Sequence, residues 1–193
     1  MKIQKGFPPS LRRSTAELYF AAFEGKIGGI LGRTGKGTAF VELVVDPTHA
    51  ICAIDDNGTK LLGLAGFKTA SGAMVGGELS DLAKIYGWFG ALWRGLILSV
   101  LERDLEDHVL LMDGIAVADG ERGKGIGTKL LYAIFAEAEK LGKTEIRLDV
   151  IDTNPKARAL YERLGFVATG KEALGPLKYV FGFSMATKMV KTV

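Results

Sequence analysis

The residues best placed to do chemistry form a basic, glycine-rich stretch between an apolar run and an amphipathic run. The stretch reads Arg122-Gly123-Lys124-Gly125-Ile126-Gly127-Thr128. Val109–Val117 before it predicts a strand, and Gly125–Leu141 after it predicts a helix. The first N–H groups of a helix have no intrahelical partners, and glycines let an anion approach them closely. The arrangement predicts a pyrophosphate site, to which Arg122 and Lys124 add positive charge.

Two common phosphate-binding loops do not match this stretch. The nucleoside-triphosphate loop requires Gly-x-x-x-x-Gly-Lys-Ser/Thr. Gly142-Lys143-Thr144 has that ending, but Glu137 stands where the first glycine is needed. The dinucleotide loop requires Gly-x-Gly-x-x-Gly, and the third glycine is missing whichever glycine starts the pattern. The spacing that remains is Arg-x-x-Gly-x-Gly, at Arg122, Gly125 and Gly127.

A second block of residues makes that spacing specific. Asn154 to Phe166 reads Asn-Pro-Lys-Ala-Arg-Ala-Leu-Tyr-Glu-Arg-Leu-Gly-Phe. In order and separation, the two blocks resemble the acyl-coenzyme A loop and the later Asn-x-x-Ala-x-x-Leu-Tyr-Glu-x-x-Gly-Phe signature of the GNAT family of N-acetyltransferases. The resemblance is specific over Leu110–Phe166 and only architectural elsewhere.

The resemblance implies the GNAT fold, an α/β fold with a mixed, mostly antiparallel central sheet and helices on both faces. The family's fourth and fifth strands run parallel and splay apart, and acyl-pantetheine enters the gap. Here those strands would be Val109–Val117 and Glu145–Ile151, preceded by an extra helical insert at Leu79–Leu101. One departure is Asp119, where the family often has proline; it adds a negative charge near the phosphates.

The activity implied is transfer of an acetyl group from acetyl-CoA to a primary amine, in a small molecule or at a peptide or protein N-terminus. The amine would attack directly, with general base and acid assistance and without a metal. The resemblance implies cofactor contacts from Ile115, Ala116 and Val117, from Arg122, Gly123, Lys124, Gly125, Ile126, Gly127 and Thr128, and from Asn154 and Tyr161.

The catalytic assignments have alternatives. Tyr161 would protonate the leaving thiolate, or it is an amphipathic residue packed against the sheet. Asp149 matches a position where some members carry a glutamate base, but it could instead orient substrate or pair with Arg147. Asp113 and His108 are further candidates for the base, because only geometry can settle that role.

The remaining elements must position these residues. We expect helices and strands in an order compatible with a single domain over residues 1–193. Ser10 is a plausible cap of the first helix, and Gly25–Gly37 reads as a loop or a broken helix. The expected helices are Ser10–Phe23 and Pro155–Leu164, and the expected strands are Ala50–Ile54, Leu61–Phe67, Phe166–Thr169 and Tyr179–Met189. Thr38–Val45 fits a short helix or a strand, and the helix is favoured.

Composition limits the partners and the compartment. The net charge of +3, from 25 basic and 22 acidic residues, is too mild to indicate nucleic acid or an anionic membrane. The single cysteine, Cys52, excludes an internal disulfide and fits a reducing compartment, so we expect a cytoplasmic protein. The apolar run Ile85–Leu101 is short for a membrane span and contains Arg94; a buried helix or a homodimer interface is expected instead.

Two other functions stay open at this stage. A GNAT-like module could sense acyl-CoA without turnover, and such a module could lose Tyr161 and Asp149. A phosphate-loop nucleotide enzyme is the weaker alternative. The acceptor amine would be set by the regions 25–37 and 71–101, which match no specific pattern.

Overall fold

The computed structural model describes residues 1–32, 35–99, 105–175 and 178–193. Within these residues the strands form one open sheet in the order β1-β2-β3-β5-β6-β8-β7, and β4 pairs with β3 outside this path. The strands are β1 Lys2–Lys5, β2 Ala50–Ile54, β3 Leu61–Thr69, β4 Gly72–Ala73, β5 Val109–Val117, β6 Glu145–Ile151, β7 Val167–Ala173 and β8 Met185–Thr192. Neighbouring strands are antiparallel except β5 and β6, which are parallel. This is the mixed sheet that the sequence predicts.

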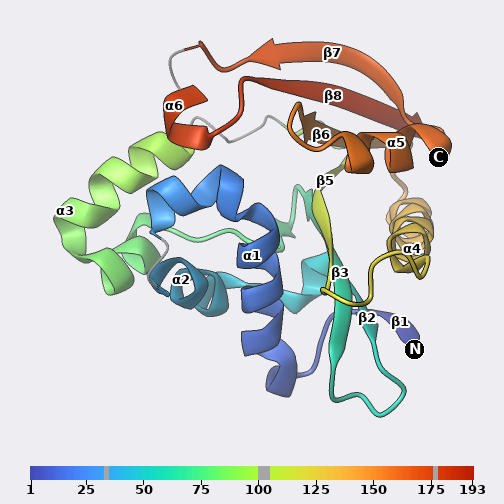
Figure 1. Cartoon of the computed structure of the whole chain (residues 1–193), viewed down its shortest axis with the longest axis horizontal. Helices are drawn as coiled ribbons and strands as arrows, with labels where there is room; N and C mark the ends of the chain where they lie inside the picture. The colour runs from blue at the N-terminus through green and yellow to red at the C-terminus, as the bar shows by residue number, and fades with distance from the viewer. Residues whose placement is uncertain (33–34, 100–104, 176–177) are drawn as a thin grey trace.

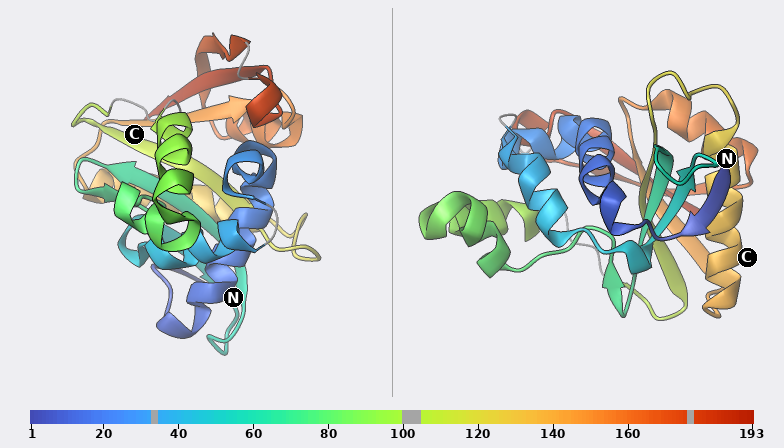
Figure 2. Two further views of the ribbon diagram at one scale, coloured as in Figure 1. Left: turned by 90° about the vertical axis from the view of Figure 1, so that its left-hand side faces the viewer. Right: turned by 90° about the horizontal axis from the view of Figure 1, so that it is seen from below.

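Helices cover both faces of the sheet (Figure 1). The helices are α1 Arg12–Leu31, α2 Lys36–Val44, α3 Leu79–Ser99, α4 Ile126–Lys140, α5 Pro155–Arg163 and α6 Lys178–Phe181, with 3-10 turns η1 Pro9–Leu11 and η2 Pro47–His49. Figure 2 shows α1 and α2 on one face, α4 and α5 on the other, and α3 outside α1 and α2. Among the described residues, no helix is both long enough and apolar enough to cross a membrane.

The parallel pair β5–β6 stays paired over only part of its length. Its register runs from Val109 opposite Glu145 to Met112 opposite Leu148. Beyond that point β5 pairs only with β3, and β6 pairs only with β8. The ends of the two strands are therefore held by different neighbours, as the predicted splay requires.

A β-bulge in β5 lies at the place where this pairing ends. Gly114 pairs with Gly66 and Met112 pairs with Phe67, so Asp113 has no partner in the β3 register. A bulge adds one residue to a strand and re-aims its side chains. Gly114 also admits the ring of Phe23, since a Cβ built there would come within 2.2 Å of Phe23 Cζ.

The region 25–37 is the broken helix that the sequence offered as one of two alternatives: α1 continues to Leu31, Gly32 follows at φ +80°, and α2 begins at Lys36. Packing that buries Ile30 and Leu31 outweighs the weak helix propensity of the glycines in α1.

Two local expectations were wrong. Ser10 does not cap the first helix, because it lies in the 3-10 turn η1, and no side chain of the described residues caps the start of α1. The predicted strand Tyr179–Met189 starts as α6 and becomes β8 only at Met185.

The other elements agree with the sequence to within a few residues. The turn between β2 and β3 forms around Asp55, whose carboxylate accepts the backbone N–H groups of Thr59 and Lys60 at 2.7 and 2.8 Å. These bonds lower the pKa of Asp55. Helix α3 covers the predicted insert as far as Ser99 and bends at Gly87, while positions 100–101 of that prediction lie outside the described residues.

Candidate active site

A cavity of about 780 Å³ lies where β5 and β6 part, on the face of the sheet covered by α1, α2 and α3. We call it the α3 cavity, and its floor is formed by Leu111, Met112, Asp113 and Asp149. A volume of this size is typical of sites that bind small molecules. The structure thus brings two of the three candidate bases to one cavity.

Of the two carboxylates on the floor, Asp113 has the more unusual environment. Its Oδ2 atom is buried and has no hydrogen-bond partner among the described residues. Burial raises the pKa of Asp113 to about 6, although the positive charges of Lys26 and Lys68 lower it in part. A carboxyl group with this pKa is mostly ionised at neutral pH and can still take up a proton, as a general base must.

The residues around Asp113 were not predicted as functional. Tyr19 and Lys26 come from α1, and Lys68 comes from β3. The pKa of Tyr19 is raised, first by burial and second by the charge of Asp113. No local motif joins these residues, so the one signal in the sequence was an acidic residue inside the apolar strand around Asp113.

Asp149 occupies a more polar position. Its Oδ2 lies 3.9 Å from the guanidinium of Arg147, and the two side chains are 17% and 19% exposed. In the sheet register Asp149 is opposite Lys188 of β8. The expected pairing with Arg147 is thus present. The other two roles considered for Asp149, proton acceptor and substrate ligand, stay predictions that fit its place on the floor of the α3 cavity.

The glycine-rich loop forms the predicted helix start. Helix α4 begins at Ile126 after Gly125, which adopts φ +77°, and Gly123 adopts φ +81°. Among the described residues, no side chain caps the helix and no atom lies within 4 Å of a Cβ built at either glycine. The amides of the first turn are therefore accessible to an anion.

The cations of the loop are held by neighbouring acids. Arg122 donates to the carbonyl of Val117 at 3.2 Å and pairs with Asp119 at 3.1 Å. Lys124 pairs with Glu121 at 2.9 Å. A bound pyrophosphate would compete with the two carboxylates for these cations. One of the carboxylates, Asp119, stands where the family often has proline, so part of this competition comes from that difference.

The two sequence blocks meet at the start of α4. A Cβ built at Gly127 would lie 3.4 Å from Leu160 of α5 and 3.7 Å from Ile115 of β5. Asn154 caps α5 as predicted, since its side chain accepts the N–H of Ala157 at 3.2 Å. The loop, the free end of β5 and α5 thus share one region beside the split.

Tyr161 lies in the core on the α4 side of the sheet. The residue is 4% exposed, and its ring centroid is 5.7 Å from that of Phe166. Burial raises the pKa of Tyr161. The residue belongs to the hydrophobic cluster that packs against α4, so packing accounts for its ring.

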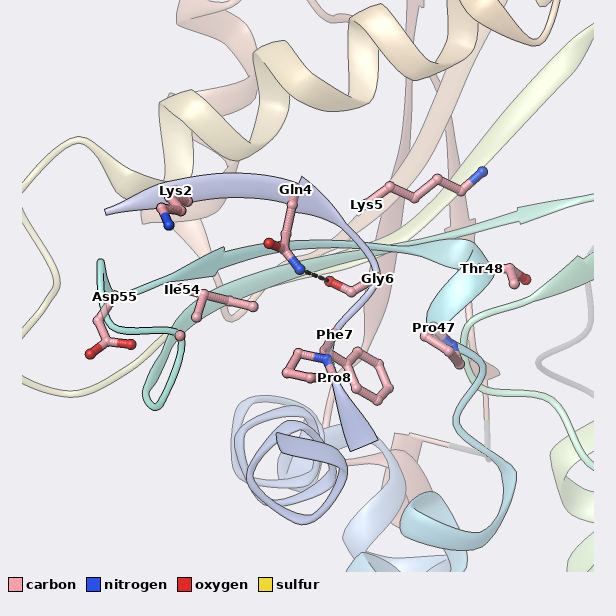
Figure 3. Close-up of a pocket in the computed structure, with 11 residues that line it drawn as sticks. Lys2, Gln4, Lys5, Gly6, Phe7, Pro8, Pro47, Thr48, Ile54 and Asp55 are labelled. Carbon is pink, nitrogen blue, oxygen red and sulfur yellow. Dashed lines mark hydrogen bonds between the residues drawn. The ribbon is translucent and has the colours of Figure 1, made fainter. Parts of the chain in front are cut away.

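The histidines and a second cavity lie elsewhere. His108 precedes β5, is exposed and lies 3.7 Å from Glu106, and it does not line the α3 cavity. His49 is buried and contacts Asp46 and Thr69, which fits a structural role. A cavity of about 730 Å³ beside β1 contains none of the predicted site residues (Figure 3).

Known proteins resemble this chain in both sequence and structure. A model of the acetyltransferase (GNAT) family matches residues 7–166. The chain is 30% identical to streptothricin acetyltransferase from Streptomyces lavendulae over 142 residues, which cover 72% of this chain and 68% of that protein. The sequence match supports the family that the two blocks predicted.

Solved structures share the fold. An N-acetyltransferase from Staphylococcus aureus Mu50 has a TM-score of 0.65 at 15% identity, covering 99% of this chain and 100% of that one. A Bacillus subtilis acetyltransferase in complex with CoA has a TM-score of 0.50 at 14% identity, covering 75% and 76%. At such identities the likeness shows the fold alone, and it confirms the predicted α/β architecture.

The cost of burying Asp113 predicts a stability difference that depends on pH. The native pKa of about 6 lies above the ordinary value of 3.8, so the native state holds the proton more tightly than the unfolded state. Ionisation therefore removes stability as the pH rises from about 4 to about 6. The free energy of unfolding of Asp113→Asn, minus that of the native protein, should therefore be roughly 1–3 kcal/mol larger at pH 8 than at pH 4. Urea unfolding at both pH values measures this, and a difference that does not change with pH would contradict it.

Proposed function

The chain belongs to the acetyltransferase (GNAT) family, and we propose that it transfers an acetyl group from acetyl-CoA to a primary amine. The observation that carries the proposal is the meeting of two half-sites where β5 and β6 part. A helix start suited to a pyrophosphate lies beside the free end of β5. A cavity with two carboxylates lies at the last paired residues of the same strands.

The donor half would be held mostly by backbone groups. The amides at the start of α4 suit the pyrophosphate, and Arg122 and Lys124 add charge. Ile115, Ala116 and Val117 lie in β5 beyond its pairing with β6, so their outer backbone groups are suited to pair with the pantetheine arm as an added strand. An N–H among them would also polarise the thioester carbonyl. Asn154 is a further contact in this proposal.

The reaction then needs a proton acceptor and a proton donor. The bound ammonium gives one proton to a carboxylate, and the amine nitrogen then attacks the carbonyl carbon as the C–S bond breaks. The second proton leaves the new amide nitrogen and, through solvent, restores the proton that Tyr161 gives to the thiolate. We assign that carboxylate to Asp113, because its Oδ2 is unpartnered among the described residues and its pKa is about 6. Asp149 then binds the incoming ammonium and is the second candidate for the base. Tyr161, which burial keeps protonated, donates its proton to the thiolate.

The acceptor class follows from the family only in outline. The similar Streptomyces lavendulae protein is a streptothricin acetyltransferase, and streptothricin therefore belongs in any panel of acceptors. A panel of small amines and peptides with acetyl-CoA, followed by free-thiol release, tests the proposal. Binding of acetyl-CoA with no thiol release on any amine would favour an acyl-CoA sensor.

Gly125→Glu should abolish binding of coenzyme A, because the side chain would occupy the loop and add negative charge beside the pyrophosphate. The matched control is Gly142→Glu, after the other end of α4. Gly142 has φ +67°, and neither glycine has an atom of the described residues within 4 Å of a built Cβ. Both variants thus carry a similar backbone strain. Calorimetry should detect binding only in the control, and normal affinity in Gly125→Glu would refute the loop assignment.

Tyr161→Phe should leave binding of coenzyme A intact and lower kcat, by about 10²-fold if the hydroxyl is the general acid. The substitution keeps the ring that packs on Phe166. Tyr132→Phe on the exposed side of α4 is the control and should keep its rate. Steady-state rates and calorimetry on both variants decide, and an unchanged kcat in Tyr161→Phe would leave the residue a packing role.

The base assignment predicts a pH profile. The kcat/KM of the native protein should rise with pH through about 6, where Asp113 ionises. Asp113→Asn should lose this rise and about 10²-fold or more in kcat/KM. Asp149→Asn should raise KM, because the ammonium loses a ligand, and should keep the rise of kcat/KM with pH. The reverse pattern, with the rise lost in Asp149→Asn, would make Asp149 the base.

A further inference from the structure

The wall of the α3 cavity differs in character from its floor, and from this contrast we propose that the acceptor is a monoamine with an apolar alkyl or aryl body. The inference rests on the proposed function, because the amine is placed at Asp113 and Asp149. Its body would lie along α1 and α3, which supply most of the wall.

The charges of the lining suit one ammonium group. Among the described residues, the lining holds three carboxylates (Asp113, Asp149 and Glu78) and two lysines (Lys26 and Lys68). Asp149 already lies 3.9 Å from the guanidinium of Arg147, so the Oδ2 of Asp113, which is unpartnered among the described residues, is the place for one ammonium. A second ammonium on the same acceptor would gain no further attraction and would meet repulsion from the lysines. A monoamine is therefore favoured over a polyamine.

The wall above the floor is hydrocarbon. Its apolar side chains include Phe23 and Ile27 of α1, Phe40 of α2, and Leu82, Leu92 and Leu96 of α3. Moving one methylene group from water to such a surface increases affinity about three- to fourfold. Each added carbon of an acceptor should therefore improve its binding until the cavity is filled.

Two of these wall residues are exposed to solvent in the free protein. Leu92 is 55% exposed and Leu96 is 74% exposed, although both line the α3 cavity. Contiguous exposed apolar side chains commonly mark a binding surface. The body of a bound amine would cover both leucines, which gives the apolar insert between β4 and β5 a function.

A homologous series of acceptors tests the inference. Thiol release from acetyl-CoA is measured with n-butylamine through n-octylamine, with spermidine as the polyamine. We expect kcat/KM to rise about three- to fourfold for each methylene and hexylamine to exceed spermidine. A flat or falling series, or a preference for spermidine, would overturn the inference.

A variant in the wall tests the location of the effect. Leu96→Asn should lower kcat/KM for octylamine about tenfold or more while butylamine changes less than about twofold. The matched control is Phe89→Asn, since Phe89 is 91% exposed on the same helix and does not line the cavity. The control should behave as the native protein with both amines. Equal effects of the two variants would show that the alkyl chain binds elsewhere.

Failure of the inference can be told from failure of the proposed function. If spermidine or short amines are acetylated without a gain for each methylene, the acetyltransferase proposal stands and the apolar acceptor is wrong. If no amine releases thiol, the acetyltransferase proposal fails, and calorimetric titration of the CoA-saturated protein with the same amines tests the wall. Affinity that rises about three- to fourfold for each methylene supports the apolar site, and a flat series overturns it.

Discussion

The candidate site depends on one constraint, the early end of pairing between β5 and β6. The two parallel strands separate after Met112 and Leu148 because β3 holds one and β8 holds the other. The separation leaves backbone groups of β5 without a strand partner on that side, and an unpaired strand edge binds extended chains. It also places Asp113 and Asp149, the next residues along each strand, on the floor of the same cavity. A single feature of the sheet thus prepares both halves of the proposed reaction.

The bulge at Asp113 buries a carboxylate, which lowers the stability of the native state. A carboxylate with a buried, unpartnered oxygen is unfavourable in the native state, and the same burial raises the pKa of Asp113. The neighbouring Gly114 lets Phe23 approach the strand more closely than any side chain at that position would allow. Phe23 and Tyr19, whose ring centroids are 4.6 Å apart, line the same cavity as Asp113. Desolvated titratable groups of this kind concentrate at functional sites, where a shifted pKa serves the chemistry.

The local geometry of the proposed donor half could be predicted from the sequence, and so could Asp113 and Asp149 as candidate bases, but the residues that surround Asp113 could not. The loop at Arg122–Thr128 and the cap at Asn154 depend on local backbone geometry, which glycine, asparagine and proline specify within a few residues. The surroundings of Asp113 instead combine α1, β3 and β6, which only the tertiary fold brings together. The same reason explains why the sequence left a loop or a broken helix open for Gly25–Gly37, since only the tertiary fold shows that Ile30 and Leu31 are buried.

Helix α3 shows how the acceptor side can vary without disturbing the donor side. It bends at Gly87, and its two halves pack closely at Gly95, where a Cβ would lie 3.1 Å from Leu79. The bent helix lies outside α1 and α2 (Figure 2), so its substitution would leave the β5–β6 split unchanged. Helix α3 supplies much of the cavity wall and none of the floor. In the proposed reaction, its side chains would therefore influence which amine binds, while Asp113 and Asp149 would act on the bound amine. The division follows from position: residues at the split are fixed by the sheet, and residues on an outer helix are constrained mainly by the ligand they cover.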